Sequence, residues 1–169
     1  MNLDAFIEYL KYMWRAKSRH GVHSPFVYDL VTHVLLDKGP IDRTYIVEYP
    51  SLPLKYENLI SRIAAYYKYK TIHQLPFKGE TQIPTNADLL IFNEREPNGW
   101  VTMMNEYFYL LGDESAVVVT GIHKTPEHTQ GWNKLCTDAR VKMSIDVYGI
   151  GLLFFKPEFK EQQHFILKY

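Results

Sequence analysis

The stretch Ser115-Ala-Val-Val-Val-Thr-Gly-Ile-His123 decides the class of fold. Its run from Ala116 to Val119 is continuously apolar and largely β-branched, which is typical of a strand buried on both faces, as in a parallel sheet. Small and polar residues, Thr120, Gly121 and His123, follow at once. Because ligands of open α/β sheets bind at the carboxyl ends of the strands, this strand end is a candidate site.

The residues after this strand predict a helix followed by two further strands. Thr125 is a suitable N-cap, Pro126 fits the first helical position, and Glu127 complements the positive end of the helix dipole. Segment 141–148 then alternates like a half-buried strand, and the turn at Gly149 leads into 150–156. We expect 150–156 to lie antiparallel between 116–120 and 141–148.

Upstream residues predict further helices and two more strands of an α/β sheet. The apolar spacing from Leu3 to Trp14 predicts an amphipathic helix, which we expect to pack on the core because it lacks the strongly basic face of a membrane-surface helix. The other predicted elements are helices 24–35, 55–67 and 100–111 (the last stopped by Gly112), an extended arm at Tyr45–Tyr49, and strands 71–75 and 88–92. We expect strands 71–75, 88–92 and 116–120 to be parallel neighbours in that order.

The composition indicates one globular domain. The chain has 169 residues, 46% of them hydrophobic, and we predict an N-terminal helical extension (1–38) ahead of an α/β core (54–169). Formal net charge is zero, so nucleic acid and anionic membranes are not predicted as partners. The single cysteine allows no intrachain disulfide and no cysteine zinc site. The N-terminus lacks the pattern of a secretory signal, so we expect a cytoplasmic protein.

The segment Arg19-His20-Gly21-Val22-His23-Ser24-Pro25-Phe26 contains two histidines but no further metal ligands. Since a zinc site needs three or four ligands, we predict no metal site. We expect His20 and His23 to cap and hydrogen-bond at the entry of the helix that begins at Ser24 and Pro25. Gly21 is expected to allow an unusual backbone angle.

Both ends of the chain resemble class I S-adenosylmethionine-dependent methyltransferases, and one bacterial branch of them in particular. The resemblance rests on the segment 19–26, on Ile122-His123 after a strand, and on two closing blocks, Ser144–Phe155 and His164–Tyr169. It implies a reduced Rossmann-like sheet, with strand order 1-4-5-7-6 in the family's own numbering. The family's second and third strands have no room in this sequence, so internal deletion is implied.

The cofactor-binding features of that family are missing from the middle of this chain. In the family, the first strand ends in an acid and a glycine-rich turn, and an acid after the next strand holds the ribose. Here strand 71–75 is followed by Pro76, Phe77, Lys78 and Gly79, with no acid. If a rebuilt cofactor site exists, the resemblance places it near Gln74, Phe77 and Gly79. We expect no useful affinity for S-adenosylmethionine.

The ends of the next two strands are also altered. Residues Asn93 and Glu94 follow strand 88–92, and His123 follows strand 116–120 without the two acids that usually precede it in the family. A lone histidine is more often structural than catalytic, because a catalyst needs a partner. Glu94 or Glu96 could be that partner, although a solvated loop is the preferred interpretation of their segment.

The sequence therefore predicts a pseudoenzyme, a catalytically inactive methyltransferase-like protein that acts as a binding or assembly module. Its partner would be a second copy of the chain or another protein. Two alternatives stay open. One is an active S-adenosylmethionine-dependent methyltransferase using His123 and Glu94, and the other is a small-molecule binder that reuses the old cleft. An enzyme should have an open polar cleft at the strand ends, whereas a binding module should have it filled by aromatics, with an apolar patch elsewhere.

Overall fold

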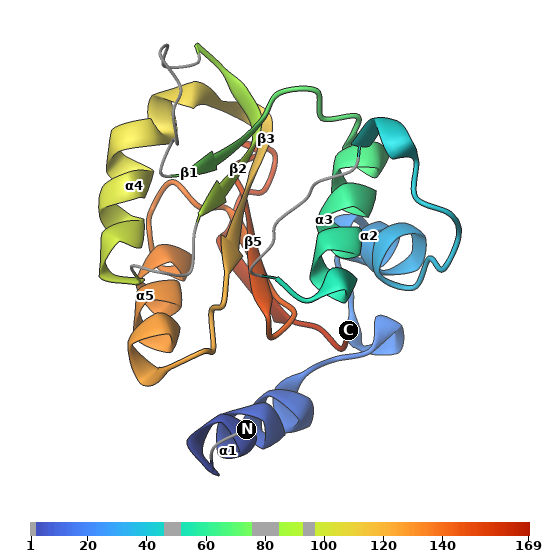
Figure 1. Cartoon of the computed structure of the whole chain (residues 1–169), viewed down its shortest axis with the longest axis vertical. Helices are drawn as coiled ribbons and strands as arrows, with labels where there is room; N and C mark the ends of the chain where they lie inside the picture. Colours follow the sequence, from blue (N-terminus) through green and yellow to red (C-terminus); the bar gives the residue numbers. More distant parts are fainter. Residues whose placement is uncertain (1–2, 46–51, 76–84, 93–96) are drawn as a thin grey trace.

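The protein folds around one six-stranded mixed sheet. The computed structural model describes residues 3–45, 52–75, 85–92 and 97–169 (Figure 1). The strands are β1 (Ile72–Leu75), β2 (Ala87–Phe92), β3 (Leu111–Thr120), β4 (Met143–Asp146), β5 (Ile150–Phe154) and β6 (Gln163–Ile166). They lie in the order β1-β2-β3-β5-β4-β6. The first three are parallel, β5 is antiparallel to both β3 and β4, and β6 is parallel to β4.

Helices cover both faces of this sheet, so that the molecule has three layers (Figure 1). On one face lie α2 (Pro25–Leu30), which continues as a π-helical segment η2 (Val31–Leu35), and α3 (Leu54–Tyr67). The other face packs against α4 (Trp100–Tyr107) and α5 (Pro126–Cys136). The remaining elements are α1 (Leu3–Arg15) and the 3-10 turns η1 (Arg19–Gly21), η3 (Arg43–Tyr45), η4 (Pro97–Gly99) and η5 (Phe108–Leu110).

Alternating side chains of the central strands feed two separate cores. Ala116 and Val118 of β3 point toward α2 and α3, whereas Val117 and Val119 point toward α4 and α5. All four are fully buried. This two-sided burial explains why the strand reads as a continuous apolar run in the sequence.

The predicted strand order and strand directions are confirmed. Residues 150–154 lie between 116–120 and 143–146, with Val118 opposite Leu152 and Leu152 opposite Ile145. Two helix starts are also confirmed. The Ser24 hydroxyl accepts from the Val27 N–H at 3.5 Å, and the Thr125 hydroxyl accepts from the His128 N–H at 3.5 Å.

Several local expectations are wrong. Gly112 does not stop the helix after Trp100, because the helical segment already ends at Leu110 and Gly112 belongs to β3. Gly21 has no positive φ. A Cβ there would instead meet the Lys17 side chain at 3.4 Å. The helix cap at Pro25 is the Ser24 hydroxyl rather than either histidine.

The apolar face of α1 does not pack on the core as expected. Tyr12 is buried, but large apolar side chains on the rest of the helix are exposed: Phe6, Ile7, Leu10, Met13 and Trp14. Figure 1 shows α1 at one end of the molecule, outside the three layers.

The edges of the sheet differ from each other. Strand β6, which the sequence did not predict, extends the sheet beyond β4. Just after β6, Leu167 forms an isolated parallel β-bridge with Lys17. At the other end β1 is the last strand in the described part of the chain. The arm expected to cover β1 begins at Tyr45, which packs against the core, but its residues 46–49 lie outside the described residues. Cover of that edge stays a prediction.

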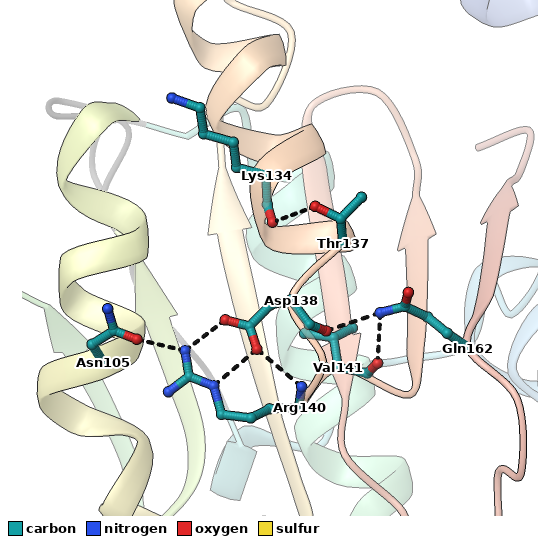
Figure 2. A network of polar contacts seen from close by, with 7 residues as sticks. All are labelled: Asn105, Lys134, Thr137, Asp138, Arg140, Val141 and Gln162. Atoms are coloured by element: carbon teal, nitrogen blue, oxygen red, sulfur yellow. Dashed lines mark hydrogen bonds and ion pairs between the residues drawn. The ribbon is translucent and has the colours of Figure 1, made fainter.

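Hydrogen bonds at the amino end of β4 fasten the helices to the sheet (Figure 2). Arg140 donates to both carboxylate oxygens of Asp138, at 2.9 and 2.6 Å, and to the side-chain oxygen of Asn105 on α4 at 2.6 Å. The Gln162 amide donates to the carbonyls of Asp138 and Val141 at 2.9 Å each. Hydrogen bonding by Arg140 lowers the pKa of Asp138. This charged cluster is internally satisfied and holds α4, β4 and the approach to β6 together.

Candidate functional site

The carboxyl ends of β3 and β4 and the beginning of β5 meet at one edge of the sheet. His123 follows β3, and Asp146 is the last residue of β4. His123 Nε2 lies 2.6 Å from Asp146 Oδ2, and His123 Nδ1 lies 3.0 Å from the hydroxyl of Thr129 on α5. The fold therefore brings a histidine and a carboxylate together from residues 23 positions apart.

The hydrogen-bonding capacity of this pair is used within the protein. An ionised carboxylate only accepts, so His123 Nε2–H donates to Asp146, and a neutral imidazole then accepts the Thr129 O–H at Nδ1. The second oxygen of Asp146 accepts the Tyr148 N–H at 2.8 Å. The side chain of His123 is 13% exposed and that of Asp146 4%. A substrate could reach a ring nitrogen only by displacing Asp146 or Thr129.

The turn between β4 and β5 supports this arrangement. Tyr148 has a positive φ of 70°. The Gly149 N–H donates to the Tyr56 hydroxyl of α3 at 3.0 Å, and the Gly149 carbonyl accepts the Gly121 N–H at 2.8 Å. A Cβ on Gly149 would overlap the Tyr56 ring. The glycine is therefore required by the close approach of an aromatic ring, not by its own backbone angle.

Tyrosines from three segments of the chain cover the pair, and we call Tyr9, Tyr12, Tyr56 and Tyr148 the tyrosine cover. The Tyr148 ring centroid lies 5.6 Å from that of His123. The rings of Tyr9 and Tyr12 from α1 lie 5.1 and 5.2 Å from that of Tyr148. The Tyr12 hydroxyl also donates to the Leu167 carbonyl. Among the described residues, aromatic rings therefore pack beside the His123–Asp146 pair.

Burial keeps the phenols of Tyr12 and Tyr56 in their neutral form. Burial raises the pKa of Tyr56 to about 12, although the Gly149 N–H acts in the opposite direction. Burial, followed by the negative charge of Asp146, also raises the pKa of Tyr12. Raised pKa values make these phenols poor proton acceptors near neutral pH.

Of the residues predicted for an alternative cofactor site, the structure describes Gln74, and it does not lie beside His123. Gln74 is exposed on β1 and pairs with Ile91 of β2. Two strand spacings, roughly 10 Å, therefore separate its strand from β3. Glu94, Phe77 and Gly79 lie outside the described residues.

Asp146 is the partner of His123 that the sequence reasoning missed. The information was present, because the predicted order and directions of the strands place the carboxyl ends of 116–120 and 141–148 at the same edge. The alternation of apolar and polar residues within 141–148 instead predicted that the side chain of Asp146 lies on the solvated face of that strand. The residue is nevertheless 3% exposed, because β6 and the tyrosine cover enclose the end of β4.

Other possible ligand sites are weak. Among the described residues no group of three or more histidine, cysteine, aspartate or glutamate side chains could hold a metal ion. A hollow of about 800 Å³ lies where the segment at Ser24 faces residues 158–165. It is lined by basic and acidic side chains together: Lys17, Lys160, Glu158 and Glu161. This mixture favours neither an anion nor a cation.

Comparison with known proteins assigns this chain neither a family nor a function. Searches with this chain found no matching family model, no matching curated protein and no matching solved structure. Within the described ranges, every helix is too short or too polar to cross a membrane.

Proposed function

We propose that this chain is a catalytically inactive methyltransferase-like protein that acts as a binding or assembly module. The order of the strands is compatible with a Rossmann-like fold, and we interpret the sheet as a reduced class I methyltransferase sheet. The single observation that carries the proposal is the closed edge at His123. Both ring nitrogens of that residue are occupied by Asp146 and Thr129.

Catalysis would require these strand ends to be open to a substrate and a cofactor. Instead the tyrosine cover lies over the His123–Asp146 pair, and its members are held by hydrogen bonds and ring contacts. The His123–Asp146–Thr129 contacts join β3, β4 and the first turns of α5, which is a structural use of a histidine. The exposed apolar side chains of α1 provide a surface suited to association.

Isothermal titration with S-adenosylmethionine tests the proposal. Loss of two hydrogen-bonded charge partners, at about 1.5–3 kcal/mol each, weakens binding by about two to four powers of ten. We therefore expect millimolar or weaker affinity. A dissociation constant near ~1 µM, about −8.2 kcal/mol, would reject the proposal and favour an active methyltransferase with a rebuilt site.

Tyr9→Ala provides a second measurement, because Tyr9 is 38% exposed and its removal uncovers part of the edge. If the cofactor-binding carboxylates are absent, opening the edge does not create affinity, and the titration stays flat. A gain of tenfold or more in affinity, beyond about 1.4 kcal/mol, would mean that the tyrosines merely close a competent cleft. Thermal-shift measurements with S-adenosylhomocysteine and other small molecules would then identify the ligand class.

A further inference from the structure

The unpartnered face of α1 consists of large apolar side chains: Phe6, Ile7, Leu10, Met13 and Trp14. We call these five residues the α1 apolar face. Trp14 is 89% exposed and Leu10 50%. Tryptophan is enriched among residues that dominate binding energy at protein interfaces. An exposed cluster of this kind on one helix marks an association surface rather than scattered surface residues.

The helix α1 has three distinct sides. At 100° per residue, Tyr9 and Tyr12 fall on the side that contacts Tyr148 and Leu167. The α1 apolar face lies on the next side. By the same spacing, four charged positions of the sequence fall on the third side: Asp4, Glu8, Lys11 and Arg15. One side of the helix thus attaches it to the domain, while the apolar side points away from the domain.

The order of charges along α1 makes the helix complementary to itself. Both acids, Asp4 and Glu8, stand in its first half, and both bases, Lys11 and Arg15, in its second half. Two antiparallel copies bring the charged sides together with the acidic half of one beside the basic half of the other. Two parallel copies put the charged sides on opposite flanks of the pair, where acids and bases do not meet. The spacing of Ile7, Leu10 and Trp14 also follows the alternating three and four residues of a coiled-coil seam.

We propose that the α1 apolar face pairs with the same face of a second copy of this chain, with the two α1 helices antiparallel. This pairing follows from a twofold axis, the commonest symmetry of protein dimers. In it the helix position of Asp4 in each copy lies near that of Lys11 in the other, at the border of the apolar contact. The inference deepens the proposed assembly function by naming the partner, and it rests on that function.

An anionic membrane surface fits this helix less well. Helices that lie on such membranes carry lysine and arginine along their polar side, and each basic residue adds to the attraction. The polar side of α1 carries two acids and two bases, with no net charge. Charge therefore favours a second copy over a lipid surface.

Sedimentation velocity of the full chain over a range of concentrations tests the pairing. We expect a reversible monomer–dimer equilibrium. Leu10→Glu and Trp14→Glu should each weaken dimerisation at least about thirtyfold, as expected for a central interface residue. The matched control is Leu36→Glu, since Leu36 is 53% exposed but lies at the end of η2. It should dimerise like the wild type, and urea unfolding should show that all three variants remain folded.

Charge reversal tests the antiparallel orientation. Asp4→Lys alone and Lys11→Glu alone should each weaken dimerisation about three- to tenfold, because like charges then meet across the pair. The double variant D4K/K11E should recover the wild-type constant. Parallel pairing predicts no recovery by the double variant relative to the single variants, and that result would overturn the orientation.

A chain that sediments as a monomer at every concentration overturns the inference. Binding of such a monomer to anionic lipid vesicles would assign the α1 apolar face to a membrane instead. A dimer that survives L10E and W14E would place the interface elsewhere, which also overturns the inference. Titration of the same samples with S-adenosylmethionine separates the two proposals. A monomer without cofactor affinity rejects only the pairing, whereas micromolar affinity rejects the proposed function whatever the oligomeric state.

Discussion

Two glycines at the β4–β5 turn set how closely aromatic rings approach the sheet. A Cβ on Gly149 would overlap the Tyr56 ring, and one on Gly151 would overlap the Trp132 ring. Both aromatic rings belong to helices that pack on opposite faces, Tyr56 to α3 and Trp132 to α5. Gly149 in the turn and Gly151 on β5 therefore allow a helix from each layer to approach this hairpin closely.

Alanine at either position should destabilise the fold. We expect Gly149→Ala and Gly151→Ala to lower the free energy of unfolding by about 2–3 kcal/mol, since a well-packed core must shift to admit each methyl group. Urea unfolding measures this. Gly112→Ala is the control, because a Cβ there meets only the Ser115 hydroxyl, at 3.9 Å. Its effect should stay within about 0.5 kcal/mol. Equal stability of G149A and G112A would show that Tyr56 does not constrain the turn.

The His123–Asp146 contact should contribute stability through coupling between the two residues. Asp146→Ala leaves two buried donors, His123 Nε2–H and the Tyr148 N–H, without their acceptor. We expect a loss of about 2–4 kcal/mol. His123→Ala in the same background should then cost less than it does alone, by at least about 1 kcal/mol. If the two substitutions lower the free energy of unfolding additively, His123 and Asp146 do not stabilise the fold through their mutual contact.

At the residue scale, sequence patterns predicted the caps but not the site. Ser24-Pro25 and Thr125-Pro126 are local signals, so the helix starts followed from neighbouring residues. The partnership of His123 with Asp146 depends on two strands separated by β5. Such a contact needs the topology first and the side-chain identities second.

Helices and strands were predictable where their own periodicity was strong. The hairpin of β4 and β5 and the parallel β1–β2–β3 unit follow from buried apolar runs and turns. Strand β6 was missed because Gln163–Ile166 is short and only partly buried, so its pairing with β4 leaves little periodic pattern. The α1 helix was predicted, but its packing was not, since an amphipathic pattern does not say what covers the apolar side.

The start of β1 is held to β2 by one carboxylate. Asp88 Oδ2 accepts the backbone N–H groups of Lys70 and Thr71 at 2.7 and 2.9 Å, and the Thr71 hydroxyl accepts the Asp88 N–H at 2.9 Å. Partial burial acts to raise the pKa of Asp88, but the N–H groups of Thr71 and Lys70 outweigh it and hold that pKa below its usual value of 3.8.

Removal of this carboxylate should loosen β1 in a pH-dependent way. We expect Asp88→Ala to cost about 1 kcal/mol near neutral pH and to speed hydrogen exchange in Ile72–Leu75. Because the folded pKa is depressed, the contribution is present above the unfolded pKa and is lost as pH falls through the folded pKa. The gap between wild type and D88A should therefore shrink in acid. Asp113→Ala, at an exposed position of β3, should leave both stability and exchange unchanged.

Across the whole molecule, buried tyrosines tie segments that are far apart in sequence. Tyr12 from α1 bonds the chain near the C-terminus, Tyr56 from α3 bonds the β4–β5 turn, and Tyr69 donates to the Glu114 carbonyl at 3.0 Å. Burial raises the pKa of all three phenols. The high tyrosine content, 13 residues, was visible in the sequence, but its use as long-range fastening required the fold.

These raised pKa values predict loss of stability in alkali, and Tyr56 allows the cause to be isolated. The pKa of Tyr56 is about 12 in the folded protein, against an ordinary value of 10.0. Between these values the unfolded chain loses the phenolic proton while the folded chain keeps it. The unfolded state then binds fewer protons, so the free energy of unfolding falls as pH rises. The contribution of the buried neutral phenol is complete below pH 10.0 and disappears as pH passes about 12.

The difference in free energy of unfolding between Tyr56→Phe and the wild type should therefore depend on pH. Near neutral pH the variant loses one hydrogen bond to the Gly149 N–H and is less stable by about 1 kcal/mol. As pH rises from 10.0 toward 12, only the wild type is weakened at this position, so the difference narrows and then reverses. Urea unfolding at a series of pH values measures it, with Tyr109→Phe at an exposed site as the control that should follow the wild type throughout. A difference that stays constant up to pH 12 would show that the phenol of Tyr56 ionises equally readily in the folded and unfolded chains.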